Sequence, residues 1–465
     1  MTSVESRPPP TLDRRNALAW AAHRLFPNVR SGILTVILIP LLGYLAYRVF
    51  LFVAVNGRWE VVERNLTLFM QGTFPRDEQW RIVAQIVLLA LAAGIGAGTA
   101  SASAHDRAIE AGLPFTRSGS LDLIRRFWSV IGFVLILLYF ASTTTPWLVA
   151  AGTVASFVVG LAARFLPTSW RNVGWALMAL ALVAGFQVVS GTSGRAWIIS
   201  AVLVALGLLS VVSFEGLAKG WARLGGRTAV ALGASAVVFL IYSNVVDPGV
   251  GWDAWSGLHL TLWVSALAIV LSFPLGLMLA LARRSSLPAL RGLATGYIEL
   301  IRGVPLITLL FMGQFILVFM LPTGSNLSDI SRAIAAMTLF TAAYVAEIVR
   351  GGLQSLPTGQ TEAGQALGLA PPTTMRKIIL PQALRAVIPA MVGQFISLFK
   401  DSTLLLIIAI NEFLGVRSLV HAQADFRAVA HAETLVFAAF GYWAFSYAMS
   451  KESQRLEHRL RVGER

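Results

Sequence analysis

The sequence predicts an all-α protein that crosses a membrane many times, and two observations carry this prediction. Of its 465 residues, 56% are hydrophobic and only 13% are charged, whereas a soluble domain carries about 25% charged residues. Apolar runs of about 18 residues or more recur along the chain, and a helix of that length crosses the hydrocarbon core of a bilayer. The composition therefore disfavours an ordinary soluble enzyme.

The net charge of +14 indicates membrane topology rather than binding of nucleic acid. Basic residues gather in short connections between the apolar runs, as expected of cytoplasmic loops, and they form no basic face interleaved with aromatic residues. The chain has no cysteine, which excludes disulfides and thiolate metal sites. Its six histidines show no metal-ligand spacing, so we expect no bound metal.

The first apolar run, residues 33–55, follows a polar lead rich in arginine. A cleavable signal peptide has a shorter apolar region and a small-residue cleavage site, so we expect a retained span with a cytoplasmic N-terminus. The two runs on either side of Pro146 could also form one kinked hairpin. Further spans are expected at about residues 81–101, 127–145, 147–164, 173–190, 197–214, 228–246, 258–282, 301–321, 332–349, 386–408 and 430–449.

The charge distribution orients these expected spans. The connection at residues 283–291 and the tail at residues 451–465 are basic and would be cytoplasmic, whereas residues 247–257 and 322–331 hold no lysine or arginine and would be outside. The loop at residues 56–80 is an exception, because it would be outside and still carries arginines, although acidic residues outnumber them. Both termini are therefore expected in the cytoplasm.

The two halves of the chain differ in character. Residues 1–250 are predicted to hold the cytoplasmic lead and about seven spans with short connections. Within the second of these spans, Gly94 and Gly98 form a small-residue face on which another helix can pack closely. Residues 256–455 carry polar side chains inside or beside their spans, so we expect the function to reside there.

The segment Leu356–Pro381 connects two spans and predicts a small helix–turn–helix on the cytoplasmic face. Thr358 is placed to cap a first short helix, and Gly368 is placed to end it in the left-handed conformation. A pair of prolines then breaks the chain, and a second short turn of helix follows. Pro381 would stand at the start of the next span, where its missing N–H costs nothing.

This segment presents a narrow surface of small residues and one carboxylate, Glu362. Helical spacing places Ala363, Ala366, Leu367 and Ala370 on one side. A helix that lies on lipid needs a face of bulky leucine, phenylalanine or tryptophan, and this one lacks it. A small-residue face suits docking into a groove on another protein, although an interfacial loop remains the alternative.

The residues Glu362-Ala363-Gly364, followed by Gly368 and Ile379-Leu380-Pro381, resemble the cytoplasmic coupling motif of type I ABC importer permeases. The family usually has alanine where this chain has Gly364. The resemblance implies a loop that seats in a cleft of a separate ATP-binding subunit and transmits its closure to the spans. By that resemblance, the coupling residues are Glu362, Ala363, Gly364, Leu367, Gly368 and Pro381.

Further motifs over residues 256–455 resemble the polar amino acid branch of that family. They are Tyr297–Glu299, Arg302–Leu306, Ala343–Ile348, Arg350–Gly352, Gln354–Pro357, Pro381–Arg385 and Lys400–Leu404. The branch more often has threonine at the position of Val304, and it has the order Thr-Ser where this chain has Ser402-Thr403.

The resemblance implies a fold and a location. The family core has five spans that begin outside and end inside, and about seven preceding spans from a cytoplasmic N-terminus agree with that parity. The long N-terminal extension resembles one of the two permeases in general L-amino acid importers of Gram-negative bacteria. We therefore expect a multi-pass protein of the bacterial inner membrane.

Partners follow from what the chain lacks. No GxxxxGK[ST] phosphate loop occurs, so this chain is expected to be a non-catalytic subunit that binds no cofactor. A cytoplasmic partner would use ATP and Mg²⁺. The resemblance further implies a second permease subunit, different from this chain or a second copy, and a periplasmic amino-acid-binding protein.

The substrate path is expected near ionisable residues at membrane depth, because such residues face the protein interior or a water-filled cavity. Lys400 and Asp401 supply both charges that a zwitterionic amino acid needs, although they could instead pair elsewhere and hold helices together. Ser402 and Thr403 could add hydroxyls or bond to helix carbonyls. Glu347 and Arg302 are nearer the cytoplasmic ends of their spans, where salt bridges or a gate are favoured over substrate contact.

Two alternatives belong to other functional classes. A secondary, ion-coupled amino acid transporter often has about twelve spans, but the expected internal repeat is absent and Leu356–Pro381 would have no role. A membrane-embedded lipid transferase would need clustered catalytic side chains near the interface, and no such cluster occurs. The sequence does not say which amino acids are carried.

Overall fold

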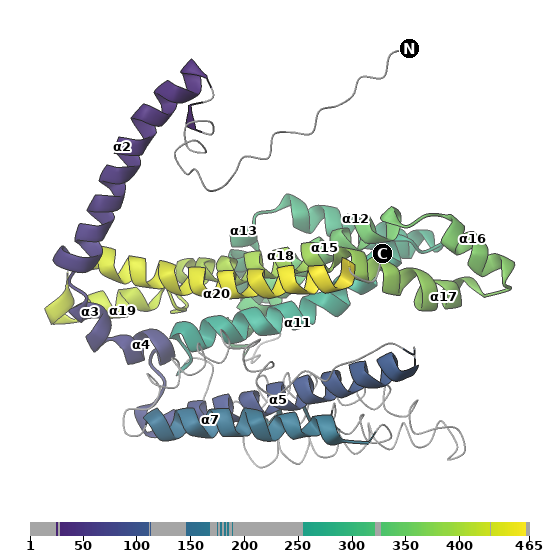
Figure 1. The fold of residues 1–465 in the computed structure, drawn as a ribbon, viewed down its shortest axis with the longest axis horizontal. Coiled ribbons are helices and arrows are strands. Elements are labelled where there is room, and N and C mark those ends of the chain that lie inside the picture. Colours follow the sequence, from purple (N-terminus) through teal and green to yellow (C-terminus); the bar gives the residue numbers. More distant parts are fainter. Residues whose placement is uncertain are drawn as a thin grey trace. The chain divides into compact units, whose positions relative to one another are not determined.

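The computed structural model describes residues 25–26, 28–110, 112, 146–167, eight positions between 174 and 188, 254–320, 327–427 and 429–461. Within this part of the chain, all named elements are helices (Figure 1). The predicted spans at 127–145, 197–214 and 228–246, with most of the span at 173–190, lie outside the described residues.

The chain divides into two units, Met1–Val61 and Val62–Arg465. In the first unit, α2 (Val29–Leu51) continues into a π-helical turn, Phe52–Asn56. The Asn28 side chain caps α2 by accepting a hydrogen bond from the Ser31 N–H. None of the residues of α2 is buried, so its apolar side chains suit a lipid environment. This helix confirms the predicted first span.

In the second unit, α5 (Gln79–Glu110) packs along α7 (Pro146–Leu161) through glycines. A Cβ on Gly94 would lie 2.2 Å from the Phe157 carbonyl oxygen, and a Cβ on Gly160 would lie 2.5 Å from the Leu91 carbonyl oxygen. These contacts require that the two backbones touch, which only glycine permits. The predicted small-residue packing face is confirmed.

The short helix α4 (Leu66–Gln71) is locked onto the start of α11 (Gly257–Arg283). Gly72 and Gly257 both have left-handed backbones, with φ of +62° and +67°, and a Cβ on Gly257 would lie 3.0 Å from the Gly72 nitrogen. Ser256 Oγ accepts a hydrogen bond of 2.7 Å from the Thr73 N–H. This part of the predicted N-terminal region therefore forms one packed unit with the helices that follow.

Phe69 of α4 fills the space next to this joint. Its side chain is fully buried, and its ring lies 6.1 Å from that of Phe413 and 5.0 Å from that of Phe437. Deeper along α11, His259 Nε2 lies 2.9 Å from Gln85 Oε1 of α5. The predicted domain boundary near residue 250 stays a prediction, because it lies outside the described residues.

Four helices form the C-terminal bundle: α11, α15 (Asp329–Ser355), α18 (Leu380–Asp401) and α20 (His431–Arg461). Two apolar clusters hold α11, α15 and α18 together. The Leu398 cluster joins the end of α18 to the start of α15 around Ile334, and the Ala383 cluster joins the start of α18 to the end of α15 around Leu353. The two helices are therefore antiparallel.

The predicted span at 301–321 is wrong at its N-terminal end. A separate helix, α12 (Pro288–Gly303), precedes the break, and α13 (Leu306–Phe311), a π-helical turn and α14 (Leu317–Met320) follow it at a bend of 105°. Val304 is extended there, with φ −108° and ψ 135°, because the ring of Pro305 excludes the helical conformation from the preceding residue.

The helix–turn–helix prediction is correct for its first helix and wrong for its second. The first helix is α16 (Gly359–Ala366). The second helix, α17 (Pro371–Thr374), is not separate, because it runs through a π-helical turn (Met375–Ile379) into α18 and a final 3₁₀ turn (Ser402–Ile408). The wide turn precedes Pro381 and accommodates its ring and missing N–H. Thr358 precedes α16 but its side chain makes no capping hydrogen bond.

Six helices in the described part of the chain are long and apolar enough to cross a membrane, and seven if the bent pair around Pro305 counts as one span. Helix α20 covers the predicted span at 430–449 but is not among them, since tyrosine, tryptophan and Glu433 dilute its apolar character. The expected total of about twelve spans therefore stays a prediction. The six are Val29–Asn56, Arg76–Asp106, Trp147–Phe165, Gly257–Arg283, Asp329–Ser355 and Pro371–Ile408.

Candidate functional site

The turn after α16 is built from hydrogen bonds that close the helix end completely. The Leu369 N–H donates to the Gly364 carbonyl oxygen at 3.0 Å, and the Gly368 N–H donates to the Gln365 carbonyl oxygen at 2.8 Å. This pair of bonds defines a Schellman motif, which needs a left-handed residue after the helix. Gly368 supplies it with φ +73°, as the sequence predicted.

Gly364 faces inward and fits against Thr374 of α17. A Cβ on this glycine would lie 2.6 Å from Thr374 Cγ2 and 2.9 Å from its Oγ1. Both residues are buried. The departure from the family's usual alanine therefore has a local cause, because α16 and α17 approach each other too closely for a methyl group.

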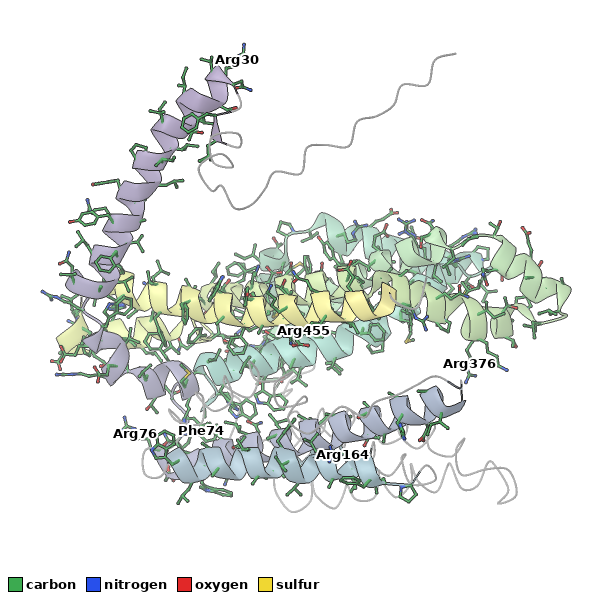
Figure 2. The ribbon with its side chains drawn as sticks, viewed as in Figure 1. Arg30, Phe74, Arg76, Arg164, Arg376 and Arg455 are labelled. Carbon is green, nitrogen blue, oxygen red and sulfur yellow. The ribbon has the colours of Figure 1, made fainter. Side chains whose placement is uncertain are left out.

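The other face of α16 is open. Glu362 and Ala363 are exposed, and so is Leu367, which is 76% accessible at the end of the helix. Figure 1 shows α16 and α17 at one end of the bundle, and Figure 2 shows Arg376 projecting beside them. Pro381 is exposed as well. The predicted coupling residues thus form one accessible surface, except for Gly364, which supports it from behind, and Pro381, which lies farther along the helix.

Helix α18 presents an exposed stripe of small and polar side chains. Its buried residues, such as Ala383, Val387 and Leu398, lie on the face toward the bundle. Besides Pro381 and Arg385 near its start, the exposed positions of α18 recur at alternating intervals of four and three residues, which is the spacing of one helical face. They are Ala386, Ala390, Gly393, Ser397 and Lys400.

Lys400 and Asp401 lie at the end of this stripe, where Lys400 is exposed and Asp401 is partly buried. The two hydroxyl residues that follow are bonded to helix carbonyls. Ser402 is fully buried and donates to the Phe399 carbonyl oxygen at 2.6 Å, and Thr403 donates to the Lys400 carbonyl oxygen at 2.8 Å. Ser402 therefore does not reach the exposed stripe, although it stays adjacent to the charged pair.

Glu347 and Arg302 lie together but away from Lys400. Glu347 accepts hydrogen bonds from Arg283 at 3.1 Å and from Arg350 Nε at 2.9 Å, and it forms an ion pair of 3.6 Å with Arg302. This arginine cluster ties α11, α12 and α15 together next to the Ala383 cluster, whereas Lys400 adjoins the Leu398 cluster. The structure thus places the six predicted path residues in two separate groups, one around Glu347 and one around Lys400.

One buried carboxylate was missed by the sequence analysis. Glu412 is completely inaccessible, and it accepts hydrogen bonds from the Leu414 N–H, the Gly415 N–H and the Tyr442 hydroxyl at 2.8, 2.7 and 2.5 Å. Burial raises the pKa of Glu412, and these hydrogen bonds oppose the shift. Its only sequence signal was an acidic residue inside an otherwise apolar stretch.

Comparison with known proteins shows where this architecture belongs. The family described as "Binding-protein-dependent transport system inner membrane component" matches residues 272–461. The glutamate/glutamine/aspartate/asparagine transport system permease protein BztC of Rhodobacter capsulatus is 36% identical over 323 residues, which cover 66% of this chain and 73% of that protein. The chain belongs to the type I ABC importer permeases.

Two further relatives agree with the polar amino acid branch of these permeases. The inner membrane amino-acid ABC transporter permease protein YhdY of Escherichia coli K12 is 44% identical over 45% of this chain, which spans 57% of its length. The probable glutamine ABC transporter permease protein GlnP of Bacillus subtilis is 37% identical over 44% of this chain, which spans 92% of its length. This type I permease is therefore the membrane subunit of an ATP-dependent amino acid importer.

The family also bears on the alternatives. Permease subunits of ABC importers are non-catalytic, which agrees with a chain that lacks a phosphate loop. None of the three relatives is a secondary transporter, so that alternative finds no support. As a membrane component of an ABC importer, the permease works with an ATPase and a substrate-binding partner.

Proposed function

We propose that this permease moves polar amino acids along the exposed stripe of α18 and receives the driving force from an ATP-binding subunit docked on α16. The observation that carries the proposal is that one continuous helical segment links the two sites. One helical run, Pro371–Ile408, begins beside α16 and ends past Lys400 and Asp401. Movement that passes from α16 to this run through the Gly364–Thr374 contact therefore reaches the candidate substrate residues along one continuous helical segment.

The docking surface has the properties that a coupling element needs. The face that carries Glu362, Ala363 and Leu367 is open, while the Schellman turn and the Gly364–Thr374 contact hold its far side. Gln382 Nε2 donates to the Ile378 carbonyl oxygen at 2.9 Å and lies 3.4 Å from Gln360 Oε1 of α16. A small stiff helix of this kind can enter a groove and transmit a push, whereas a flexible loop would absorb it.

The stripe on α18 suits a small zwitterion. Small side chains leave room beside the helix, and Lys400 and Asp401 offer opposite charges to the carboxylate and ammonium groups of an amino acid. BztC is named for transport of glutamate, glutamine, aspartate and asparagine, so we propose substrates of this polar class. The arginine cluster around Glu347 is proposed to hold the opposite end of the bundle closed rather than to select substrate.

The remaining assignments follow from this arrangement. The ATP-binding subunit is proposed to supply all use of ATP and Mg²⁺, so that this chain binds no cofactor. We propose that α16 lies on the cytoplasmic side, where it meets that subunit, and that both termini are cytoplasmic in a protein of the bacterial inner membrane. A second permease subunit would complete the path, and a periplasmic amino-acid-binding protein would deliver cargo to the outer face.

The proposal is tested by reversing the one charge on the docking surface. The tagged importer is purified in mild detergent with all its subunits, as wild type and as Glu362→Lys. We expect the variant to insert normally, to lose most of its ATP-binding subunit and to lose uptake of radiolabelled glutamine. The control is Glu63→Lys on α3 (Glu60–Arg64). It reverses an exposed carboxylate that is almost 300 residues before Glu362 in the sequence. Normal recovery and normal uptake with Glu362→Lys would refute the docking assignment.

A further inference from the structure

Glu412 lies at one end of a chain of hydrogen bonds whose other end is beside Lys400 and Asp401. The Tyr442 hydroxyl donates to Glu412 Oε2 at 2.5 Å. The same hydroxyl oxygen lies 3.2 Å from Ser402 Oγ, which donates to the Phe399 carbonyl oxygen at 2.6 Å. These hydrogen bonds join Glu412, in the loop after α18, to Tyr442 of α20 and to Ser402 at the end of α18.

The proton inventory shows that this chain runs in one direction. A hydroxyl has a single hydrogen to donate, and the Tyr442 hydroxyl donates its hydrogen to Glu412. The Ser402 hydroxyl must then be the donor in its contact with the Tyr442 oxygen, so its hydrogen is shared between that oxygen at 3.2 Å and the Phe399 carbonyl oxygen at 2.6 Å. Glu412 is therefore the terminal acceptor, and by taking the Tyr442 hydrogen it leaves the Tyr442 oxygen to accept from Ser402.

The loop that carries Glu412 is held on both sides and stores strain. Ala409 ends the 3₁₀ turn with φ +64°, a left-handed conformation that a residue with a Cβ rarely adopts. The Gly257 N–H donates to the Asn411 carbonyl oxygen, and the Phe413 N–H donates to Thr261 Oγ1, both at 2.9 Å. These two bonds tie the loop to α11, while Glu412 ties it to α20.

The ring of Tyr442 makes packing contacts and its hydroxyl makes hydrogen bonds, so a substitution can remove one contribution and keep the other. Its ring lies 5.2 Å from that of Phe399 and 5.8 Å from that of Phe413, so a phenylalanine would keep these contacts. Only the hydroxyl connects Glu412 to Ser402, the residue directly after Lys400 and Asp401. Loss of that hydroxyl would release the helix end without opening a cavity.

We propose that Glu412 is a positioning residue of the translocation path, which acts through Tyr442 and Ser402 to fix the helix end that presents Lys400 and Asp401 to the amino acid. This inference rests on the proposed function, because it takes these two residues as the substrate contacts.

The absence of cysteine makes a direct test available. Ser397→Cys introduces a single thiol on the exposed stripe, one helical turn before Lys400 and Asp401. The assembled importer is labelled with a small maleimide, with and without saturating glutamine or glutamate. The labelling rate is compared in the otherwise wild-type chain and in chains that also carry Tyr442→Phe, Glu412→Gln or Tyr447→Phe. The last change removes an exposed hydroxyl from the same helix and is the matched control.

We expect the amino acid to slow labelling several-fold in the Ser397→Cys chain and in the Tyr447→Phe control. Protection should vanish with Tyr442→Phe and Glu412→Gln, while the folded Tyr442→Phe chain still retains the ATP-binding subunit. Unchanged protection with Tyr442→Phe would overturn the positioning role and leave the path intact. Absence of protection in the Ser397→Cys chain alone would overturn the proposed substrate contacts, and the positioning role with them.

Discussion

Gly364 and Thr374 fit together so closely that a methyl group on the glycine would lie 2.6 Å from Thr374 Cγ2. Real Cβ atoms essentially never approach a neighbour this closely, so an alanine would push α16 away from α17. The residue that departs from the family motif is thus matched by a residue ten positions later. The two residues are best regarded as one unit of the docking surface.

The first prediction follows from this pair. Gly364→Ala should weaken docking and reduce uptake several-fold, because the added methyl group displaces the face that carries Glu362. The double change Gly364→Ala with Thr374→Ala should restore uptake, since it removes both clashing atoms. Co-purification of the ATP-binding subunit and uptake of radiolabelled glutamine measure the effect.

The matched control for that experiment is Gly359→Ala. This glycine lies at the start of the same helix, and a Cβ there meets nothing within 4 Å. Its replacement should leave docking and uptake unchanged. If Gly364→Ala behaved like Gly359→Ala, or if Thr374→Ala failed to rescue it, the contact would not matter for coupling.

The second prediction concerns the arginine cluster. Glu347→Gln removes the carboxylate that holds three arginines, and loss of hydrogen bonds to a charged group costs about 1.5–3 kcal/mol. We expect a lower thermal unfolding temperature in detergent, with residual uptake that keeps its wild-type dependence on substrate concentration. Arg284→Ala removes an adjacent exposed arginine and should change little. A Glu347→Gln variant of normal stability that fails to transport would instead make this carboxylate part of the path.

The third prediction is a dependence of stability on pH through His421 of α19 (Val416–Ala422). Its Nδ1 lies 3.1 Å from the Phe426 carbonyl oxygen, which only accepts, so Nδ1 carries a proton, and its Nε2 lies 2.9 Å from Thr434 Oγ1. Burial lowers the pKa of His421, the hydrogen bond to Phe426 opposes this shift, and electrostatic interactions with His431 and Arg417 lower the pKa further. The ring of His431 also stacks on that of His421 at 3.8 Å.

The sign of this effect follows from proton binding. Because the pKa of His421 is lower in the folded protein than its usual 6.5, the unfolded chain binds more protons between the two values. The stabilisation is present above about pH 6.5 and is lost as the pH falls through the folded value. Thermal unfolding between pH 5 and pH 8 should show a steeper loss for wild type than for His421→Asn. Parallel curves would contradict the prediction.

The fourth prediction tests how α4 is anchored. Phe69→Ala should lower the free energy of unfolding by about 3–5 kcal/mol, because it leaves a cavity between fully packed rings. The same substitution at Phe50, which is 61% exposed on α2, should have a much smaller effect in detergent. Thermal unfolding of both variants measures the difference, and equal effects would mean that α4 is not part of the core.

The elements that follow from local chemistry could be predicted from the sequence. Apolar runs located the spans that the structure describes, Gly94 marked a close helix contact, and Gly368 ended α16 in the predicted conformation. The break before Pro305 was also readable, because a residue before proline avoids the helical conformation. The expected span at 301–321 did not take the effect of Pro305 on Val304 into account.

The features that depend on distant partners could not be predicted. Glu412 is buried because Tyr442, thirty residues later, donates to it, and its loop is held by Thr261, which is 152 residues before Phe413. The residues near Glu412 in the sequence predict neither contact. The same holds for the burial of Ser402, since its contact with Tyr442 of α20 could not be read from the sequence around it.

The joint between Gly72 and Gly257 bears on how such a chain could have arisen. The family match begins at residue 272, yet two left-handed glycines on either side of that joint are fitted to each other without room for a methyl group on Gly257. A permease that acquired extra helices by simple gene fusion would have had to remodel both partners before they could meet in this way. Exchange of N-terminal regions between relatives should therefore succeed only when both glycines are exchanged together, so the structural unit is larger than the family domain at residues 272–461.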